Sequence, residues 1–464
     1  MKRFSAAAIL AIIVLVSAYP GECAFKLPSP EKVALKNGLT LFYFKNVDYP
    51  LISFRMLVRG AGSAFEPGEF EGMAALTAEL LQKGTAKTDA AAIAEAVDFM
   101  GARFDISAGS ENASIMAESL SEHFPRLMEI AADCLMNSLF KEDEFAKERS
   151  KRIDNIKAIK DNPGSAVRPY FTKAYFGAHP MGHLASGTES SLKKMTASGV
   201  KDFYKKYYRP ERAIAAVVGN IEKAKLIEVL EATLGRWNVP GPAAPLPVPP
   251  NFPKPKGKKL VLIDKPDATQ AYWILGAPGY PLGDKITPQA DVMNTLIGGR
   301  FTSWLSTELR IKRGLTYGAS SYFQTWSIDG LFAASSYTKN DKIGEMLDIT
   351  FDLLKKARRE GFAAEEVESS RNYLQGQFPQ RLESNGSKAG AYAMLAFFNL
   401  GFDYYDRYLA KVQAASRAEA KAAAVKLLPE TDFVLVVVGK AAEIRKQLEK
   451  YGTWTEKKIT DPDF

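Results

Sequence analysis

The segment Ala215-Ala216-Val217-Val218-Gly219 recurs near the end of the chain as Val436-Val437-Val438-Gly439. Short apolar runs of this kind predict buried strands. In both places a Pro-Glu pair precedes the run, and a helical pattern that ends in Gly-x-Trp follows it. These flanking residues are Pro210-Glu211 with Gly235-Arg236-Trp237, and Pro429-Glu430 with Gly452-Thr453-Trp454. Because Gly219 and Gly439 are 220 residues apart, the repeat excludes a solenoid and predicts two equivalent domains.

A proline-rich segment separates the two copies of this pattern. Residues 239–256 contain eight prolines, which exclude a helix or a central strand and favour a stiff, extended linker. We therefore assign residues 25–238 to a first domain, residues 239–256 to the linker and residues 257–464 to a second domain.

Hydrophobic periodicity predicts that each half mixes strands and helices. Besides the two repeated runs, strands are expected at residues 39–44, 51–58, 104–108, 113–119, 272–275, 317–323 and 331–337. Helices are expected at residues 70–83, 89–99, 123–138, 142–160, 289–297 and 301–312. Strands are grouped with helices and do not strictly alternate with them. The predicted fold class is therefore α+β, with two duplicated domains, each a sheet with helices packed on one face.

Composition excludes several classes of protein. The chain has 464 residues, of which 46% are hydrophobic and 25% charged, as in ordinary globular proteins. Two cysteines exclude a disulfide scaffold and a multi-cysteine zinc module, and three histidines disfavour a histidine-rich metal site. The net charge of +8 is spread along the chain without a dense Lys/Arg block, so we expect no nucleic-acid partner.

The N-terminus has the pattern of a secretory signal. Lys2 and Arg3 precede an apolar run over residues 6–16, and Val16-Ser17-Ala18 offers small residues for cleavage after Ala18. The run is shorter than the roughly 20 residues that span a bilayer. We assign residues 1–24 to the signal peptide, with an approximate end, and expect a periplasmic protein without a membrane span once it is removed. The alternative is an uncleaved anchor.

Common catalytic motifs are missing from the sequence. It contains no G-x-x-x-x-G-K-[ST], no G-x-G-x-x-G and no G-x-S-x-G. The S-x-x-K match at residues 190–193 is a pattern that occurs often by chance. His179 and His183 have the four-residue spacing of a metal-binding helix, but Pro180 and Gly182 break any helix there. Two hydrogen-bonded histidines in a loop are therefore favoured over a metal site.

The order of short motifs resembles the pitrilysin/insulinase-like metallopeptidases, in the branch of the mitochondrial processing peptidase and its bacterial relatives. The resemblance covers nearly all of the chain after the signal. Its landmarks are Lys36-Asn37-Gly38-Leu39-Thr40, Arg59-Gly60-Ala61-Gly62-Ser63, Glu71-Gly72-Met73, Lys83-Gly84-Thr85, Tyr207-Tyr208-Arg209-Pro210, Ile297-Gly298-Gly299-Arg300 and Leu309-Arg310-Ile311-Lys312-Arg313-Gly314-Leu315-Thr316-Tyr317.

This resemblance implies that the zinc site of the family is lost. Active relatives carry an inverted motif, H-x-x-E-H, in which two histidines on one helix face hold zinc and the glutamate activates its water. Ala75, Ala78 and Glu79 stand at the histidine, glutamate and histidine positions, and Asn155 stands where a later carboxylate ligand is expected. The chain is therefore expected to bind no zinc here, with Glu79 as a solvated or hydrogen-bonded side chain.

The resemblance also implies that a substrate-binding pair is retained. Some active relatives carry an arginine and a tyrosine seven residues apart in the domain that faces the zinc, and Arg310 and Tyr317 match them. We expect Arg310 in the last turn of a helix that ends at Gly314, and Tyr317 at the start of the next strand. A guanidinium and a phenol are suited to hold a peptide carbonyl oxygen. The alternative is a helix-capping arginine beside a tyrosine packed at a sheet edge.

These two expectations favour a non-zinc subunit of a heterodimeric zinc peptidase. It would supply Arg310 and Tyr317 and half of a chamber for peptide hydrolysis, while a homologous, zinc-bearing partner supplies the metal. A catalytically inactive scaffold or binding protein of the same fold is the alternative. A peptidase that acts alone with unrecognised ligands is a third possibility, and the scarcity of histidines disfavours it.

Overall fold

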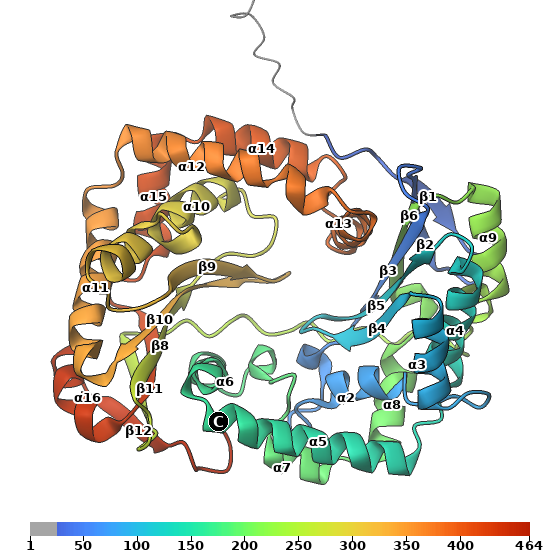
Figure 1. The fold of residues 1–464 in the computed structure, drawn as a ribbon, viewed down its shortest axis with the longest axis horizontal. Helices are drawn as coiled ribbons and strands as arrows, with labels where there is room; N and C mark the ends of the chain where they lie inside the picture. Colours follow the sequence, from blue (N-terminus) through green and yellow to red (C-terminus); the bar gives the residue numbers. More distant parts are fainter. Residues whose placement is uncertain (1–25) are drawn as a thin grey trace, which may run out of the picture.

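Two six-stranded sheets, one from each half of the chain, form the framework of the molecule (Figure 1). The computed structural model describes residues 26–464, and the predicted signal peptide, residues 1–24, lies outside them. The strand order is β1-β2-β6-β3-β5-β4 in the first sheet and β12-β7-β11-β8-β10-β9 in the second. Five strands of each sheet therefore hold corresponding positions, as a duplication requires, while the edge strands β1 and β12 differ: β1 is antiparallel to β2 and β12 is parallel to β7.

The strands of the two sheets have similar bounds and pairing. The first sheet consists of β1 (Glu31–Ala34), β2 (Thr40–Lys45), β3 (Leu51–Arg59), β4 (Arg103–Ala108), β5 (Asn112–Leu120) and β6 (Ala213–Gly219). The second consists of β7 (Lys258–Asp264), β8 (Gln270–Pro278), β9 (Ala319–Thr325), β10 (Gly330–Lys339), β11 (Phe433–Gly439) and β12 (Trp454–Lys458). The two Val-Val-Gly segments form β6 and β11. Each pairs with one parallel and one antiparallel neighbour, and the predicted fold class is confirmed.

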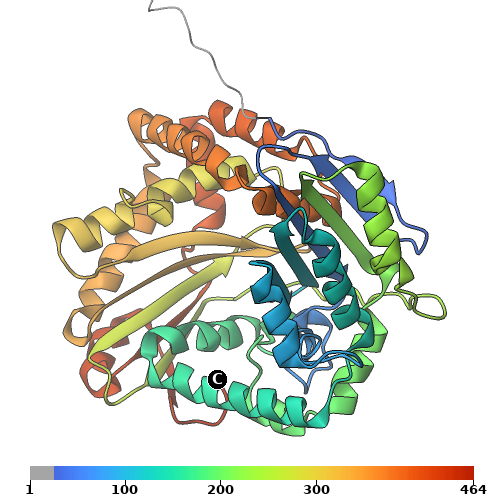
Figure 2. The ribbon, with the colours of Figure 1, turned by 45° about the vertical axis from the view of Figure 1, so that its right-hand side comes forward.

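Helices of the same half cover the outer face of each sheet (Figures 1 and 2). In the first half these helices are α2 (Met73–Leu80), α3 (Ala90–Phe99), α4 (Phe124–Asn137), α8 (Ala197–Tyr207) and α9 (Lys223–Ala232), with α5 (Glu142–Asp161) and α7 (Glu189–Lys194) beyond them. In the second half they are α10 (Thr287–Asn294), α11 (Ile343–Arg359), α12 (Ala364–Gln377), α14 (Tyr404–Ala414), α15 (Arg417–Leu427) and α16 (Ala441–Leu448). Two π-helical segments, Thr295–Gly299 and Ser306–Lys312, follow α10.

Each half also lends one helix to the other half's sheet. Helix α6 (Pro163–Phe176) packs on β8 and β11, and α13 (Asn385–Phe397) packs on β3 and β6. Both helices lie between the two sheets (Figure 1). The sequence analysis predicted neither helix. The inner face of each sheet is therefore partly covered as well, in addition to the predicted helical layer on one face.

The proline-rich segment contacts both domains. Residues 239–256 form no helix or strand. The Arg209 guanidinium donates to the carbonyl oxygen of Val239 at 3.3 Å. Farther along, Phe252 is buried and packs edge-on against Phe176 and Trp326, with ring centroids 5.2 and 5.3 Å away. The segment thus runs across both halves in an extended form.

One predicted helix boundary differs from the structure at a glycine. The helix expected at residues 70–83 is shorter, Met73–Leu80. It starts late because Gly72 has φ +90°, and a Cβ there would lie 2.7 Å from Gly187.

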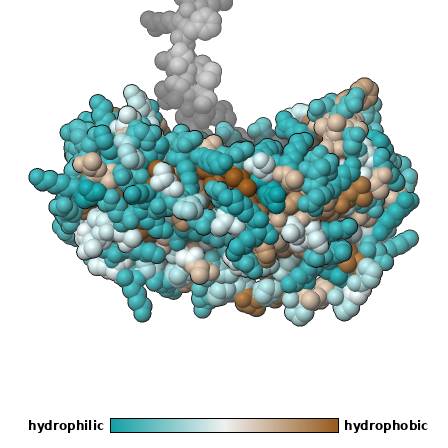
Figure 3. Space-filling view, turned by 90° about the horizontal axis from the view of Figure 1, so that it is seen from below, coloured by the Kyte–Doolittle hydropathy of each residue, from teal (hydrophilic) through white to brown (hydrophobic). Residues whose placement is uncertain are grey.

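Within residues 26–464 no helix is long and apolar enough to cross a membrane. The face that is seen from below is mostly hydrophilic, with a band of apolar groups near its middle (Figure 3).

Asp291 of α10 is a titratable group within the helical layer of the second domain. Its carboxylate accepts a hydrogen bond from the Tyr408 hydroxyl at 2.6 Å. Burial raises the pKa of Asp291 from 3.8 to about 6, against the lowering effects of Tyr408 and of the Arg381 charge. Because the folded state holds the proton more tightly, the stabilisation from this group is complete below about pH 4 and is lost as the pH rises through 6.

We expect Asp291→Asn to remove this pH dependence. The amide keeps an acceptor for Tyr408 and carries no charge, so at pH 7 the variant should be more stable than the wild type by up to about 3 kcal/mol. Urea unfolding at pH 4, 5, 6 and 7 measures the difference, which should vanish at pH 4. The exposed Asp352→Asn serves as the control and should follow the wild-type curve. Equal stability of Asp291→Asn and wild type at pH 7 would contradict the prediction.

Candidate functional site

The N-terminus of α2 is held by a buried carboxylate. Glu66 accepts hydrogen bonds from the backbone N–H groups of Ala74 and Gly72, at 2.7 and 3.2 Å. His183 Nδ1 lies 3.2 Å from the same carboxylate. Burial raises the pKa of Glu66, and the contacts with His183, Ala74 and Gly72 oppose that rise. This network fixes the helix on which the family's zinc motif would lie.

The four positions that the resemblance assigns to the zinc site lie on α2 and α5. Ala78 is fully buried, and Ala75 and Glu79 are half-buried one helical turn apart. Asn155 is exposed on α5. Of the four side chains, only Glu79 and Asn155 carry atoms with lone pairs, and Glu79 is already engaged by cations.

Glu79 belongs to an ion-pair cluster between α2 and α5. Arg152 donates to the Glu79 carboxylate at 2.9 Å and to the carbonyl oxygen of Ala185 at 3.1 Å. Lys83 Nζ lies 2.9 Å from the buried carboxylate of Glu148. Burial alone would raise the pKa of Glu148, but its contacts with Glu79 and Lys83 and the charge of Lys151 lower it to about 2. The carboxylates of Glu79 and Glu148 and the three cations Lys83, Lys151 and Arg152 therefore pair within one cluster.

The residues present do not fit a zinc ion. Zinc requires three or four nitrogen, sulfur or oxygen ligands in tetrahedral geometry, whereas two of the four positions are methyl groups. Glu79 accepts from a guanidinium. Within residues 26–464 no three His, Cys, Asp or Glu side chains are placed to hold a metal ion together.

Both histidines of the loop at residues 179–183 make hydrogen bonds within the chain. His179 Nε2 lies 2.9 Å from the carbonyl oxygen of Pro250, and its Nδ1 accepts from the backbone N–H of Met181 at 3.1 Å. His183 contacts Glu66 and, at 3.2 Å, the carbonyl oxygen of Ser63. Both histidines therefore form hydrogen bonds with other parts of the chain, namely the linker and the segment before α2.

Arg310 lies at the end of the π-helical segment Ser306–Lys312 and is half-buried. Its guanidinium carbon stands 4.7 Å from the centroid of the Phe301 ring. In the described part of the chain it has no ion pair and no side-chain hydrogen bond. Its neighbours differ, because Lys312 and Arg313 both pair with Glu308. Arg310 is thus oriented by an aromatic ring and keeps its donors free.

Tyr317 is 81% exposed and lies two residues before β9. The expectation that Tyr317 begins the strand was therefore wrong, because β9 starts at Ala319. No hydrogen bond or cation–π contact joins Tyr317 to Arg310 among the described residues. The structure places the two side chains on one corner, at the end of a helix and on the loop that follows it, without direct contact.

Thr316 anchors that corner, and the sequence analysis missed it. Its hydroxyl donates to the carbonyl oxygen of Gly318 at 3.0 Å and accepts from the Ser336 hydroxyl at 3.3 Å. On the helix side, Gly314 has φ +62°, and its N–H donates to the carbonyl oxygen of Arg310 at 3.1 Å, a common helix ending. A threonine between Gly314 and Gly318 is the sequence signal that could have indicated this hydrogen-bonded turn.

Each sheet has two edge strands, which pair on one side only within residues 26–464: β1 and β4 in the first sheet, β9 and β12 in the second. Beside β4, a cleft of about 640 Å³ lies between the first sheet and α13, and Arg55, Arg103, Met116, Glu118 and Phe398 are among its lining residues. An extended peptide has room there next to unpaired backbone groups.

Family models and curated relatives match most of this chain. The model of the insulinase family, peptidase family M16, matches residues 52–189, and that of the peptidase M16 inactive domain matches residues 194–374. Among curated relatives, YmxG of Bacillus subtilis is 26% identical over 77% of this chain and 86% of its own length. SCO5738 of Streptomyces coelicolor is 28% identical, over 70% and 72%. Both are described as uncharacterized zinc proteases.

Two solved structures share the fold. A peptidase M16 inactive domain from Pseudomonas fluorescens superposes with a TM-score of 0.82 at 24% identity, over 89% of this chain and 98% of that one. A protease from Helicobacter pylori superposes with a TM-score of 0.83 at 22% identity, over 89% and 100%. At these identities the structures establish the fold alone. Together the two family models cover more than half of the chain, which therefore belongs to the insulinase (pitrilysin-like, M16) peptidase family.

Proposed function

We propose that this chain is the non-zinc subunit of a heterodimeric zinc peptidase and contributes Arg310 and Tyr317 to substrate binding. The observation that carries the proposal is the state of Arg310. Its guanidinium is oriented by Phe301 at 4.7 Å, yet it has no ion pair or hydrogen bond among residues 26–464. A fixed guanidinium with free donors is suited to a ligand from outside the chain.

The cluster around Glu79 supports the absence of zinc from this subunit. Arg152 already supplies the positive charge that balances Glu79. Ala78 offers no carboxylate that can act as a base. A homologous partner with an intact inverted motif would hold the zinc and activate water, and no group of this chain is assigned to that step.

The chemical role of Arg310 and Tyr317 is to hold the carbonyl oxygen of the peptide bond. Both side chains donate hydrogen bonds, and the Arg310 charge interacts more strongly as negative charge develops on that oxygen. Contacts that strengthen in the transition state accelerate the reaction. The position of Phe301 under the guanidinium limits its motion, which preserves this orientation.

Peptides in extended conformation are the proposed substrates. The open edges of β4 and β9 allow strand addition, in which backbone hydrogen bonds give affinity with little dependence on sequence. The cleft beside β4 would form part of the chamber in this subunit. Arg55 and Arg103 line it together with Glu118, so side chains of either charge find a partner there.

A catalytically inactive scaffold of the same fold is the second candidate. The observation that favours it is that Glu79 pairs with Arg152, Lys83 and Lys151, which leaves α2 without a reactive group. In a scaffold, Arg310 and Tyr317 would have no substrate.

A pull-down of the tagged chain from its native host separates the two candidates. We expect a homologous subunit with an H-x-x-E-H motif to co-purify, and peptide cleavage by the eluate to be abolished by a chelator. Recovery of the chain alone, or in a complex that cleaves no peptide, would support the scaffold.

In the reconstituted pair, we expect Arg310→Ala and Tyr317→Phe each to lower kcat by about 100-fold, with a smaller change in KM. The reason is that loss of one donor to a developing oxyanion typically costs 10²–10³ in rate. Steady-state cleavage of a fluorogenic peptide measures the effect.

Arg313→Ala is the matched control for Arg310→Ala. Arg313 is three residues away and is already paired with Glu308, so it has no free donor for substrate and its loss should leave kcat close to the wild-type value. Equal losses in the Arg310 and Arg313 variants would point to a general effect on the helix end and sink the proposed role.

We expect the purified chain to contain less than about 0.1 zinc per molecule, because the ligand positions carry two methyl groups. Its unfolding temperature should be unchanged by a chelator, since metal binding would otherwise contribute folding energy. Elemental analysis and thermal unfolding test both points, with the zinc-bearing partner as the positive control. One zinc per chain, lost with a fall in unfolding temperature, would be the opposite outcome.

We also propose that residues 1–24 direct export to the periplasm. Mass spectrometry of the chain from fractionated native cells should find an N-terminus between residues 19 and 25 in the periplasmic fraction. A chain that retains Met1 in the membrane fraction would indicate an uncleaved anchor.

A further inference from the structure

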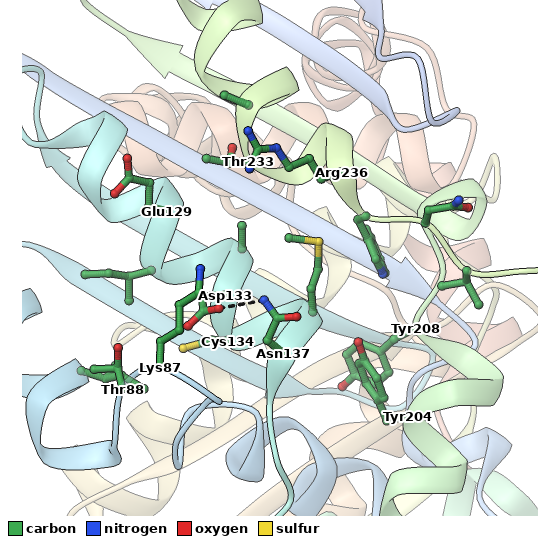
Figure 4. Close-up of a pocket in the computed structure, with 18 of the residues that line it drawn as sticks. Lys87, Thr88, Glu129, Asp133, Cys134, Asn137, Tyr204, Tyr208, Thr233 and Arg236 are labelled. Atoms are coloured by element: carbon green, nitrogen blue, oxygen red, sulfur yellow. Dashed lines mark hydrogen bonds between the residues drawn. The ribbon is translucent and has the colours of Figure 1, made fainter.

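A cleft of about 1080 Å³ opens on the outer face of the first domain (Figure 4). Four parts of the fold enclose it: the loop before α3 with Lys87, the exposed side of α4 with Asp133, the end of α8 with Tyr204 and Tyr208, and the turn after α9 with Arg236. The corner that carries Arg310 belongs to the second domain. The cleft is therefore separate from the proposed substrate site.

Two buried polar groups in the walls of this cleft have no hydrogen-bond partner. They are the Tyr208 hydroxyl and the Trp237 indole N–H, on side chains that are 0% and 1% exposed. The neighbouring Tyr204 differs, because its hydroxyl donates to the carbonyl oxygen of Leu135. Burial raises the pKa of Tyr208, so its hydroxyl stays protonated and can donate. Unpaired buried groups are costly and need an explanation.

The second domain shows that the fold does not require these groups. Its equivalent of Trp237 is Trp454, whose indole N–H donates to the carbonyl oxygen of Leu448 at 2.9 Å. Leu428 occupies the position after α15 that Tyr208 occupies after α8, so no hydroxyl is buried there. In the corresponding cleft, the Tyr451 hydroxyl is paired with Asp348 at 2.7 Å. The unpaired donors are thus specific to the first domain.

Charge and polarity around the cleft indicate the ligand chemistry. Lys87 and Arg236 have no ion pair among the described residues, whereas Arg126 is paired with Glu129. Asp133 is hydrogen-bonded to Asn137 at 2.8 Å. The indole N–H is a donor only and requires an acceptor. Apolar walls are provided by Ala92, Ile93, Ala96, Ile130 and Met136. An anionic, acceptor-rich head and an apolar body satisfy these features together.

We propose that this cleft binds a small amphipathic carboxylate, whose oxygen atoms accept hydrogen bonds from Trp237 and Tyr208 and whose charge is balanced by the cations Arg236 and Lys87 elsewhere in the cleft. The aromatic or aliphatic body of the ligand lies along α4. Ligand pockets commonly combine such apolar walls with a few placed polar groups. The assignment does not depend on the peptidase role, and its test measures binding without activity.

The probe for the test is 3-phenylpropionate, with 3-phenylpropanol as the uncharged counterpart. The full chain is labelled with 5-fluorotryptophan, and its five tryptophans are followed by fluorine NMR, with Trp237 assigned from Trp237→Phe. We expect 3-phenylpropionate to shift the Trp237 signal saturably and to leave the Trp454 signal in place. The alcohol should bind about tenfold more weakly or not at all, which corresponds to one lost charged contact.

Matched variants identify the groups that bind. Tyr208→Phe removes a hydroxyl that has no partner, so without the probe its unfolding temperature should equal or exceed that of the wild type. Tyr204→Phe removes a bonded hydroxyl and should unfold at a lower temperature. Tyr208→Phe and Arg236→Gln should each lower the affinity for 3-phenylpropionate by about tenfold. Arg126→Gln, on a residue of the rim that is already paired, should leave the affinity unchanged.

Three outcomes would overturn the proposal. The first is a Trp237 signal that does not respond to the carboxylate. The second is equal binding of acid and alcohol, which indicates apolar adsorption only. The third is a Tyr208→Phe variant that is destabilised without the probe, because its hydroxyl then already has a partner such as a trapped water.

Discussion

The exchange of one helix between the two halves is the constraint on which the rest of the structure depends. Helix α6 leaves the first domain to pack on the second sheet, and α13 does the reverse. The contact is close enough that a Cβ on Gly276 of β8 would overlap the ring of Phe171 on α6. Neither sheet can keep its inner face covered if the halves separate. The proline-rich segment therefore connects two domains that α6 and α13 already hold in contact. The same contacts fix the position of the corner with Arg310 relative to α2.

Within that framework, an ion-pair cluster stands where the family's metal would lie. A zinc site concentrates positive charge between two helices, and here Arg152, Lys83 and Lys151 supply positive charge to Glu79 and Glu148. Glu148 is the buried member of the cluster, and removal of Lys83 would leave its carboxylate without its nearest compensating charge, which is destabilising. These ion pairs link α2 and α5 and hold the two helices together.

The sequence predicted those parts of the structure that follow from local pattern or from repetition. The strands β6 and β11 and the helices α4 and α5 follow from patterns among neighbouring residues. The duplication follows from the repetition of such a pattern in the second half. Helix α6 was not predicted, because what stabilises it is burial against β8, more than 90 residues away in the chain. The same reason applies to Arg152, whose partner Glu79 lies 73 residues earlier. The start of β9 was predicted two residues too early, at Tyr317, because the turn at Thr316 depends on a hydrogen bond with Ser336 in another strand.

The two domains illustrate how duplicated folds diverge in the places that the core does not control. The equivalent strands β6 and β11 are both apolar, and all their residues are buried except Ile214, which is half-buried. By contrast, the segment between β3 and β4 of the first sheet carries Glu79 and Lys83 of the ion-pair cluster, and its counterpart between β8 and β9 of the second sheet carries Arg310 and Tyr317. The turn after the last long helix shows the same asymmetry, since Trp454 bonds to its own helix and Trp237 does not. A polar group that one copy satisfies internally and the other leaves unpaired is not a requirement of the fold. Its explanation has to be sought in what that copy contacts.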